Sequence, residues 1–339
     1  MATTRRRLLM AAGAGAGAIG ALALPSRRAQ AAEFSLRFGH GFPDTHPLNV
    51  RAREAAARIK DESKGRLVID LYPNSQLGGD SDLLNQVRSG AVDFFATGGL
   101  ILSTLVKPAA ISGMGFAFSN YDTVWPAMDG DLGVYIRDAF AKAKLHAFTR
   151  IWDNGFRQIT TSTRAIVTPQ DLQGFKIRVP VSSIYTSLFK ALGSAPTSIN
   201  LGEVYSALQT HICDGQENPL IVVDTTKFYE VQKYVSMTNH IWDGNWVLAN
   251  GDSWASLPPD LQGIVERNFD ASALEQRADI ARLNASLRDT LAGRGLIVNA
   301  PDPAPFKQKL QEAGFYASWR NQFGSATWEL LEKYVGKLA

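Results

Sequence analysis

Residues 174–180, with the sequence Gly-Phe-Lys-Ile-Arg-Val-Pro, form the stretch from which the fold of this chain is best argued. Basic and apolar residues alternate from Lys176 to Val179, which predicts a short strand with one apolar face. The proline that follows ends the strand, and residues 182–192 have the pattern of a helix with a serine near its N-cap. Arg178 is therefore expected at the carboxyl end of a strand and beside a helix N-terminus. Ligands bind at this place in open α/β sheets.

A guanidinium at such a place suits a carboxylate better than other common small-molecule groups. Its planar fork of N–H donors matches two carboxylate oxygens, and a helix N-terminus favours negative charge. We therefore expect Arg178 to bind the carboxylate of a small ligand. The alternative is a solvated or salt-bridged surface arginine, which is the more common role near a strand end.

Strand and helix patterns alternate before this stretch. Strands are expected at residues 34–38, 67–72 and 91–96, and helices at residues 48–64 and 80–89. This β-α-β-α-β order predicts a parallel sheet with helices on both faces.

The later segments predict more α/β structure. Strands are expected near residues 146–152 and 155–163, and residues 214–219 have the composition of a tight turn. A long amphipathic helix is expected from Pro258 to about Leu291, long enough to run past two lobes.

The length of the chain predicts two lobes, because about 300 residues are many for a single hydrophobic core. We expect lobe I to comprise residues 33–154 and 244–283, and lobe II residues 155–243 and 284–339. The patterns predict an α/β fold with parallel or mixed sheets flanked by helices.

Residues 1–31 have the pattern of a cleaved export signal. Three consecutive arginines, Arg5–Arg7, precede a run of alanine, glycine and leucine that ends near Ala31. Paired arginines before a mildly apolar core favour the twin-arginine type and predict a periplasmic protein. A membrane anchor is the weaker interpretation, because the run is short, rich in glycine and ended by Pro25 and two further arginines.

Charge and cysteine content exclude several classes of function. Removing residues 1–31 removes five arginines and no acidic residue, so the formal charge changes from +3 to −2. A chain of that charge has no general attraction for nucleic acid or anionic membranes. The single cysteine, Cys213, cannot form an internal disulfide.

Searches for catalytic and metal-binding patterns predict no enzyme, cofactor or metal site. Residues 15–20 match a dinucleotide fingerprint but lie in the expected signal with no strand before them. Ser187 and Lys190 match a serine–lysine acylation motif without its companion motifs. The five histidines lack metal-ligand spacing.

Several blocks of sequence occur in the order found in the solute-binding proteins of TRAP (tripartite ATP-independent periplasmic) transporters, which this chain resembles. The resemblance covers nearly all of the chain after the expected signal. The blocks are residues 72–78, 152–162, 175–180, 191–197, 203–210, 214–220, 228–234 and 238–240.

This resemblance implies the two-lobed periplasmic binding protein fold, in which two α/β lobes, joined by strands and a long helix, close on one organic acid and present it to a membrane permease. Arg178 matches the arginine that pairs with the ligand carboxylate in such proteins. Arg157 and Asn218 match the usual second and third partners of the same carboxylate. The alternatives are that Arg157 forms an interlobe salt bridge and that Asn218 shapes a turn.

Two departures from the family pattern bear on the ligand. Leu201 stands where relatives often have an aromatic residue, and residues 94–99 lack the acidic group that sialic-acid binders place near Gly98. Both departures argue against a polyhydroxylated sugar acid.

Trp152 and Trp242 lie beside the family blocks and favour an aromatic or apolar monocarboxylate, although each is also a candidate for the core. His40 and Asp80 follow expected strands and are candidates for contact with the distal end of the ligand, with loop capping as the alternative.

The sequence therefore predicts a periplasmic solute-binding protein that captures a small carboxylate for a TRAP permease. One alternative is a sensory binding protein that signals to a membrane kinase. The other is an exported hydrolase or lyase on the same two-lobed frame, which would need a catalytic constellation that the sequence does not show.

Overall fold

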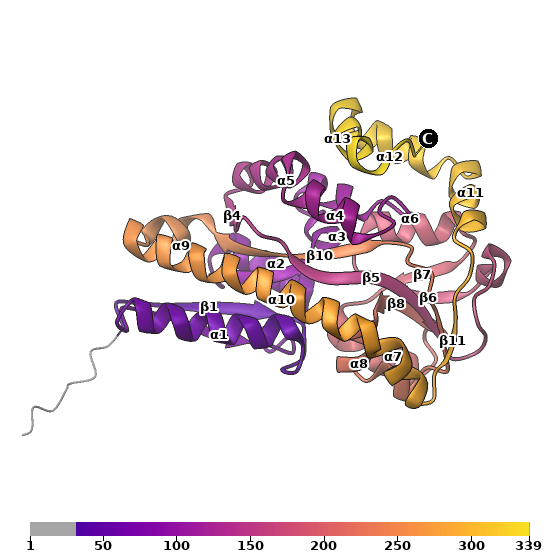
Figure 1. Ribbon diagram of the computed structural model, residues 1–339, viewed down its shortest axis with the longest axis horizontal. Coiled ribbons are helices and arrows are strands. Elements are labelled where there is room, and N and C mark those ends of the chain that lie inside the picture. Colours follow the sequence, from indigo (N-terminus) through magenta and orange to yellow (C-terminus); the bar gives the residue numbers. More distant parts are fainter. Residues whose placement is uncertain (1–31, 339) are drawn as a thin grey trace, which may run out of the picture. The chain divides into compact units, whose positions relative to one another are not determined.

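The computed structural model describes residues 32–338, in which one mixed β-sheet separates two layers of helices (Figure 1). The expected export signal, residues 1–31, lies outside the described residues. The order of strands in the sheet is β2-β1-β3-β10-β5-β8-β6-β7, with β4 beside β10 and β9 between β5 and β11. The strands are β1 (Phe34–His40), β2 (Leu67–Tyr72), β3 (Phe94–Gly98), β4 (Leu145–Ala147), β5 (Trp152–Thr161), β6 (Lys176–Val179), β7 (Ala195–Ser198), β8 (Gly215–Pro219), β9 (Tyr234–Ser236), β10 (Trp242–Asn250) and β11 (Ile297–Asn299).

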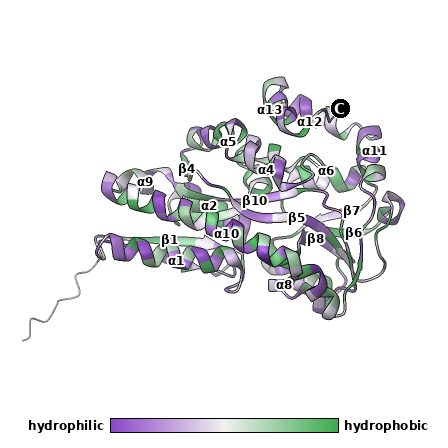
Figure 2. Cartoon of the chain, in the orientation of Figure 1, coloured by the Kyte–Doolittle hydropathy of each residue, from purple (hydrophilic) through white to green (hydrophobic). Residues whose placement is uncertain are grey.

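Each layer of helices packs its apolar side chains into a separate hydrophobic cluster on its own face of the sheet. Helices α1, α7, α8 and α10 cover one face, and α2, α4, α5, α6 and α11 to α13 cover the other. The colours in Figure 2 show hydrophobic and hydrophilic residues on the same helices, as amphipathic helices over a sheet require. The α-helices are α1 (Pro47–Glu62), α2 (Asp80–Ser89), α3 (Gly99–Leu102), α4 (Tyr121–Met128), α5 (Asp131–Lys142), α6 (Ser183–Ala191), α7 (Val204–Gln209), α8 (Leu220–Thr225), α9 (Gly251–Ser256), α10 (Pro259–Gly293), α11 (Ala304–Glu312), α12 (Phe315–Phe323) and α13 (Ser325–Val335), and the 3-10 helices are η1 (Lys107–Gly113), η2 (Pro169–Leu172), η3 (Leu201–Glu203) and η4 (Phe228–Glu230).

The amino-terminal part of the sheet has the predicted arrangement. Strand β1 pairs in parallel with both β2 and β3. The connecting helices lie on opposite faces, because α1 packs into one cluster through Leu48 and Ile59 whereas α2 packs into the other through Leu83 and Val87. The prediction of a parallel sheet with helices on both faces is confirmed.

The prediction of a tight turn at residues 214–219 is wrong. This segment is β8, a buried strand that lies between β5 and β6 and is antiparallel to the first and parallel to the second. Its polar residues suggested a turn, but they have partners inside the protein. The Gln216 amide, for example, donates to Thr160 Oγ1 at 2.8 Å. Polarity alone therefore misidentified a strand whose side chains bind one another rather than water.

Strands β5 and β10 join the two parallel parts of the sheet. The carboxyl-terminal part of β10 pairs with β3, and its first residues pair with β5, whose far end pairs with β8. The register between β5 and β10 shifts at Asp243 and Gly244, and Gly155, opposite Asp243, has a φ of 111° that favours glycine. The sequence analysis expected strand near residues 146–152 and did not identify β10. The chain leaves the sheet after β4 and returns at Trp152.

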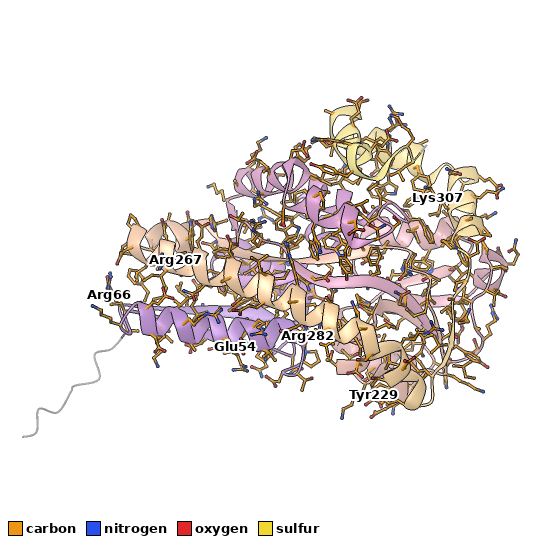
Figure 3. The ribbon with its side chains drawn as sticks, in the orientation of Figure 1. Glu54, Arg66, Tyr229, Arg267, Arg282 and Lys307 are labelled. Carbon is orange, nitrogen blue, oxygen red and sulfur yellow. The ribbon has the colours of Figure 1, made fainter. Side chains whose placement is uncertain are left out.

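The long helix α10 contacts both parts of the sheet, as predicted. It packs against α1 through the pair of Arg51 Nε with Asp279 Oδ2 at 2.6 Å, and it packs against α8 and β11 farther along. Figure 3 labels Glu54 on α1 and Arg282 on α10, where the two helices run side by side. Within residues 32–338, neither this helix nor any other combines the length and apolar character needed to span a membrane.

The middle of α10 is fastened to β5 by one side chain. The Gln276 amide nitrogen donates to the Asp153 carbonyl at 2.7 Å, and the Asp153 backbone N–H donates to Gln276 Oε1 at 2.9 Å. Both groups are buried, so no water can replace these bonds.

Replacing Gln276 by alanine should destabilise the fold, since each buried backbone group left unpaired costs about 1–3 kcal/mol. Urea denaturation should show a lower free energy of unfolding for Gln276→Ala. Leu274→Ala, at a half-exposed position on the same helix, is the control and should change that free energy by less than about 0.5 kcal/mol. Equal effects of the two substitutions would contradict the role given to Gln276.

Asp153 is buried where β5 meets β10. Burial raises the pKa of its carboxyl group to about 7, although the Trp242 Nε1–H that donates to Oδ1 at 3.0 Å favours the ionised form. In the unfolded chain the pKa of this carboxyl group is about 4. The folded protein therefore holds the proton more tightly than the unfolded chain.

Stability should consequently fall as pH rises from about 4 to about 7, with the full loss present above the folded pKa. Asp153→Asn keeps an oxygen acceptor for Trp242 and removes the titration. The measured quantity is the melting temperature of the variant minus that of the wild type at the same pH. We expect this difference to be larger at pH 8 than at pH 5. A difference that stays constant over that range would show that Asp153 does not titrate there.

Candidate functional site

A small cavity of about 30 Å³ lies where the carboxyl ends of β3, β6 and β8 meet. Strands β5 and β10 contribute residues between the two groups of parallel strands. This is the place at which ligands bind in open α/β sheets. The cavity is lined by Phe42, Asp80, Thr97, Gly98, Leu100, Ile101, Asn154, Arg157, Arg178, Pro180, Tyr185, Leu201, Asn218, Asp243 and Asn245.

Arg178 lies near the carboxyl end of β6, next to the start of α6, as predicted. Only 1% of the residue is exposed. Its Nε and Nη2 atoms donate to the Ile199 carbonyl at 2.8 and 2.5 Å, and within residues 32–338 its buried Nη1 atom has no hydrogen-bond partner. Burial lowers its pKa to about 10, so the group stays charged at neutral pH. The cavity thus contains a fixed cation with an unused donor.

Arg157 is also buried, but it is already paired. Its Nε and Nη2 atoms bind the two carboxylate oxygens of Glu217 at 2.5 and 2.8 Å, and Nη1 binds Asp243 Oδ2 at 2.7 Å. Burial alone would raise the pKa of Glu217, but Arg157 and a hydrogen bond from His240 at 3.0 Å hold it below its usual value. Arg157 therefore forms buried salt bridges, but both partners lie in the same expected lobe, residues 155–243, and the residue also lines the cavity.

Asn218 lies on β8 rather than in a turn. Its Oδ1 atom accepts from Arg157 Nη2 at 3.0 Å, and its Nδ2 atom donates to Gln216 Oε1 at 2.5 Å. Arg157 thus fixes the orientation of the Asn218 amide, and one N–H of that amide is left without an assigned acceptor.

Two buried acids line the cavity, Asp80 at the start of α2 and Asp243 on β10. Burial raises the pKa of both carboxyl groups. A Cβ atom added to Gly98 would lie 2.8 Å from Asp243 Oδ1. The acidic group that residues 94–99 lack is therefore supplied next to Gly98 by another strand, which the sequence analysis did not foresee.

Further polar atoms of the cavity are buried and have no hydrogen-bond partner in the described part of the chain. They are Asn154 Oδ1, the Tyr185 hydroxyl and both side-chain polar atoms of Asn245. Buried polar groups normally have partners, so this set indicates a polar ligand. Sequence reasoning missed Tyr185 because its helical spacing is that of a core residue, and missed Asn245 because β10 was not recognised.

Four of the seven residues predicted for the ligand site line one cavity, namely Arg178, Arg157, Asn218 and Asp80. The other three do not. Trp152 is fully buried in the cluster that α1 and α10 cover, and Trp242 packs edge-on against two other aromatic rings. His40 is buried, with its Nε2 atom 3.2 Å from Asn49 Oδ1. Of the two roles considered for Trp152 and Trp242, the structure shows the core, because both rings are buried and neither lines the cavity.

No metal centre is found among residues 32–338, where no group of three or more histidine, cysteine, aspartate and glutamate side chains could hold an ion. The acids of the cavity are instead engaged by Arg157 and by neutral hydrogen-bond donors such as Asn154, whose Nδ2 atom lies 3.1 Å from Asp243 Oδ2.

Comparison with known sequences identifies the family. Residues 38–318 match the bacterial extracellular solute-binding proteins of family 7. The y4mM protein of Sinorhizobium fredii is 34% identical over 276 residues, which are 81% of this chain and 50% of that protein, so the chain spans about half the length of this relative. The sialic acid-binding periplasmic protein SiaP of Vibrio cholerae is 31% identical over 261 residues, 77% of this chain and 81% of SiaP.

Solved structures show the same fold. The sugar acid binding protein DctPAm of Advenella mimigardefordensis, in complex with galactonate, has a TM-score of 0.86 at 26% identity and covers 91% of this chain and 100% of its own. A TRAP periplasmic solute-binding protein of Sulfurospirillum deleyianum with bound succinate has a TM-score of 0.84 at 25% identity and covers 89% of this chain and 99% of its own. With its cavity, its α/β architecture and its long helix, the chain belongs to family 7 of the bacterial extracellular solute-binding proteins, the solute-binding proteins of TRAP transporters.

Proposed function

We propose that this protein captures one small organic carboxylate in the cavity, in the periplasm, and delivers it to a TRAP permease. The observation that carries the proposal is the unused donor of Arg178, a buried guanidinium whose Nη1 atom has no partner among the described residues. A buried guanidinium without a directly bound carboxylate is costly, and a ligand carboxylate would supply that partner.

The other cation of the cavity strengthens the assignment to Arg178. Arg157 already binds the carboxylates of Glu217 and Asp243, so its charge is compensated within the protein. Among residues 32–338, the only hydrogen-bond partner of Arg178 is the Ile199 carbonyl. An incoming anion should therefore bind Arg178, with the remaining N–H of Asn218 as a second donor.

The related proteins support the class of ligand. SiaP is named for sialic acid, and the two solved structures hold galactonate and succinate. All three compounds are small acids, and we extend that class to this chain. The family is one of solute-binding proteins, and we propose no catalytic step.

Closure of two lobes is the proposed mechanism of capture. We take residues 33–154 and 244–283 as one lobe, and residues 155–243 and 284–339 as the other. Asp80 would then contact the ligand from the first lobe, and Arg178 from the second. A ligand that contacts both lobes binds the closed state more tightly than the open state and shifts the population toward closure.

Substitution of Arg178 tests the carboxylate site. Arg178→Lys keeps the charge and loses the planar fork, so affinity for an acid that binds the wild type should fall by about 10- to 100-fold, as expected for a lost charge-assisted bond of about 1.5–3 kcal/mol. Isothermal titration calorimetry measures the change.

The matched control is Arg164→Lys. Arg164 also donates through Nε and Nη2 to one backbone carbonyl, that of Asp171, but it lies at the surface. Its substitution should leave affinity unchanged. Wild-type affinity in the Arg178→Lys variant would remove the central support of the proposal.

Delivery to a permease is tested separately from binding. In proteoliposomes that contain the TRAP permease of the same organism, uptake of the bound acid should require this protein and should fall with Arg178→Lys. Tight binding without any uptake would instead favour the alternative of a sensory binding protein.

A further inference from the structure

We propose that the ligand is a hydroxylated monocarboxylate whose hydroxyl groups bind Asn245 and Asp243, two residues of β10. This inference rests on the proposed function, because it takes the single carboxylate of the ligand to lie at Arg178. It departs from the aromatic or apolar acid that the sequence favoured.

Asn245 presents two polar atoms to the cavity. It is fully buried, it lines the cavity, and neither its Oδ1 nor its Nδ2 atom has a hydrogen-bond partner among residues 32–338. Its backbone lies between Gly98 of β3 and Trp152 of β5, so the side chain is fixed on a central strand. An aromatic or alkyl ligand would leave both atoms unpaired. A hydroxyl group, which donates and accepts, can satisfy either of them.

Asp243 lies two residues before Asn245 and presents a complementary group. Its Oδ2 atom accepts from Arg157 and Asn154, whereas Oδ1 accepts no hydrogen bond from the described residues. Oδ1 is also the atom next to Gly98, where a side chain would lie only 2.8 Å from it. The glycine therefore leaves space in front of a carboxylate oxygen that lacks a donor. A ligand hydroxyl would supply that donor.

The charges of the cavity argue against a second ligand carboxylate. Among the residues that line it, Arg157 and Arg178 carry the only positive charges, and Arg157 is paired with Glu217 and Asp243. The remaining charged residue of the lining, Asp80, is acidic. A dicarboxylate would thus place its second anionic group beside carboxylates, with no cation left to compensate it.

Acids of matched chain length test this inference by isothermal titration calorimetry. At four carbons the probes are erythronate, butyrate, succinate and 4-aminobutyrate. At six carbons they are galactonate, hexanoate and adipate. For at least one length, we expect the hydroxylated acid to bind the wild type about tenfold or more tightly than its counterparts, since unpaired buried polar groups penalise the others.

Asn245→Leu has nearly the volume of the native residue and removes both polar atoms. This variant should lose the preference for the hydroxylated acid and keep its affinity for the unsubstituted one. The smaller substitution Asn245→Ala serves if the leucine variant does not fold. Arg178→Lys should weaken all the acids alike.

The outcomes separate this inference from the proposed function. If, at both chain lengths, an acid without hydroxyl groups binds as tightly as the hydroxylated acid or more tightly, and this binding still depends on Arg178, the hydroxyl assignment alone is overturned. An unchanged preference in the Asn245 variants would do the same. Absence of binding by every acid of the panel would count against the proposed carboxylate capture itself.

Discussion

The ion pairs of Arg157 determine how the site is built. This one guanidinium connects β5, which carries it, with Glu217 on β8 and Asp243 on β10. A buried ion pair adds little net stability, because desolvation of the charges offsets their attraction. Its effect is therefore mainly positional. It connects three strands around the cavity and fixes the amide of Asn218. The carboxylates of Glu217 and Asp243 also compensate the charge of Arg157, which is one of the two positive charges that line the cavity. What remains available to a ligand is the charge of Arg178.

Local periodicity predicted much of the fold. The strand at residues 67–72 and the helix at residues 80–89 have the expected bounds, because a parallel sheet with amphipathic helices leaves a regular pattern in the sequence. The same reasoning placed Arg178 at the carboxyl end of a strand, since an alternating segment followed by proline and a serine-capped helix fixes that geometry locally. Whether its guanidinium had an internal partner depended on distant residues and could not be predicted.

Features set by contacts between distant segments were missed. Residues 214–219 resembled a turn because the polar side chains of β8 have partners on other strands, which a single sequence does not show. Strand β10 was not predicted, because both of its faces are buried. It therefore lacks the alternation of polar and apolar residues that a half-exposed strand shows. Trp152 and Trp242 were expected near the site because they lie close to the family blocks in the sequence. Both rings are instead buried in the core, where a large aromatic side chain stabilises the fold most.

The two kinds of recognition in this cavity come from different strands. The proposed carboxylate site belongs to β6, whose position is fixed by the local strand–helix unit, whereas the groups proposed to bind the hydroxyls of the ligand belong to β10. β10 also pairs with β5 at the register shift beside Gly155, so the residues that would select a ligand lie on the strands that join the two parts of the sheet. A hydroxyl bound by Asp243 or Asn245 would therefore act directly on those joining strands. In this arrangement an acid bound only through its carboxylate would contact Arg178 of β6 and Asn218 of β8 but no residue of β10, which links the choice of ligand to the proposed closure.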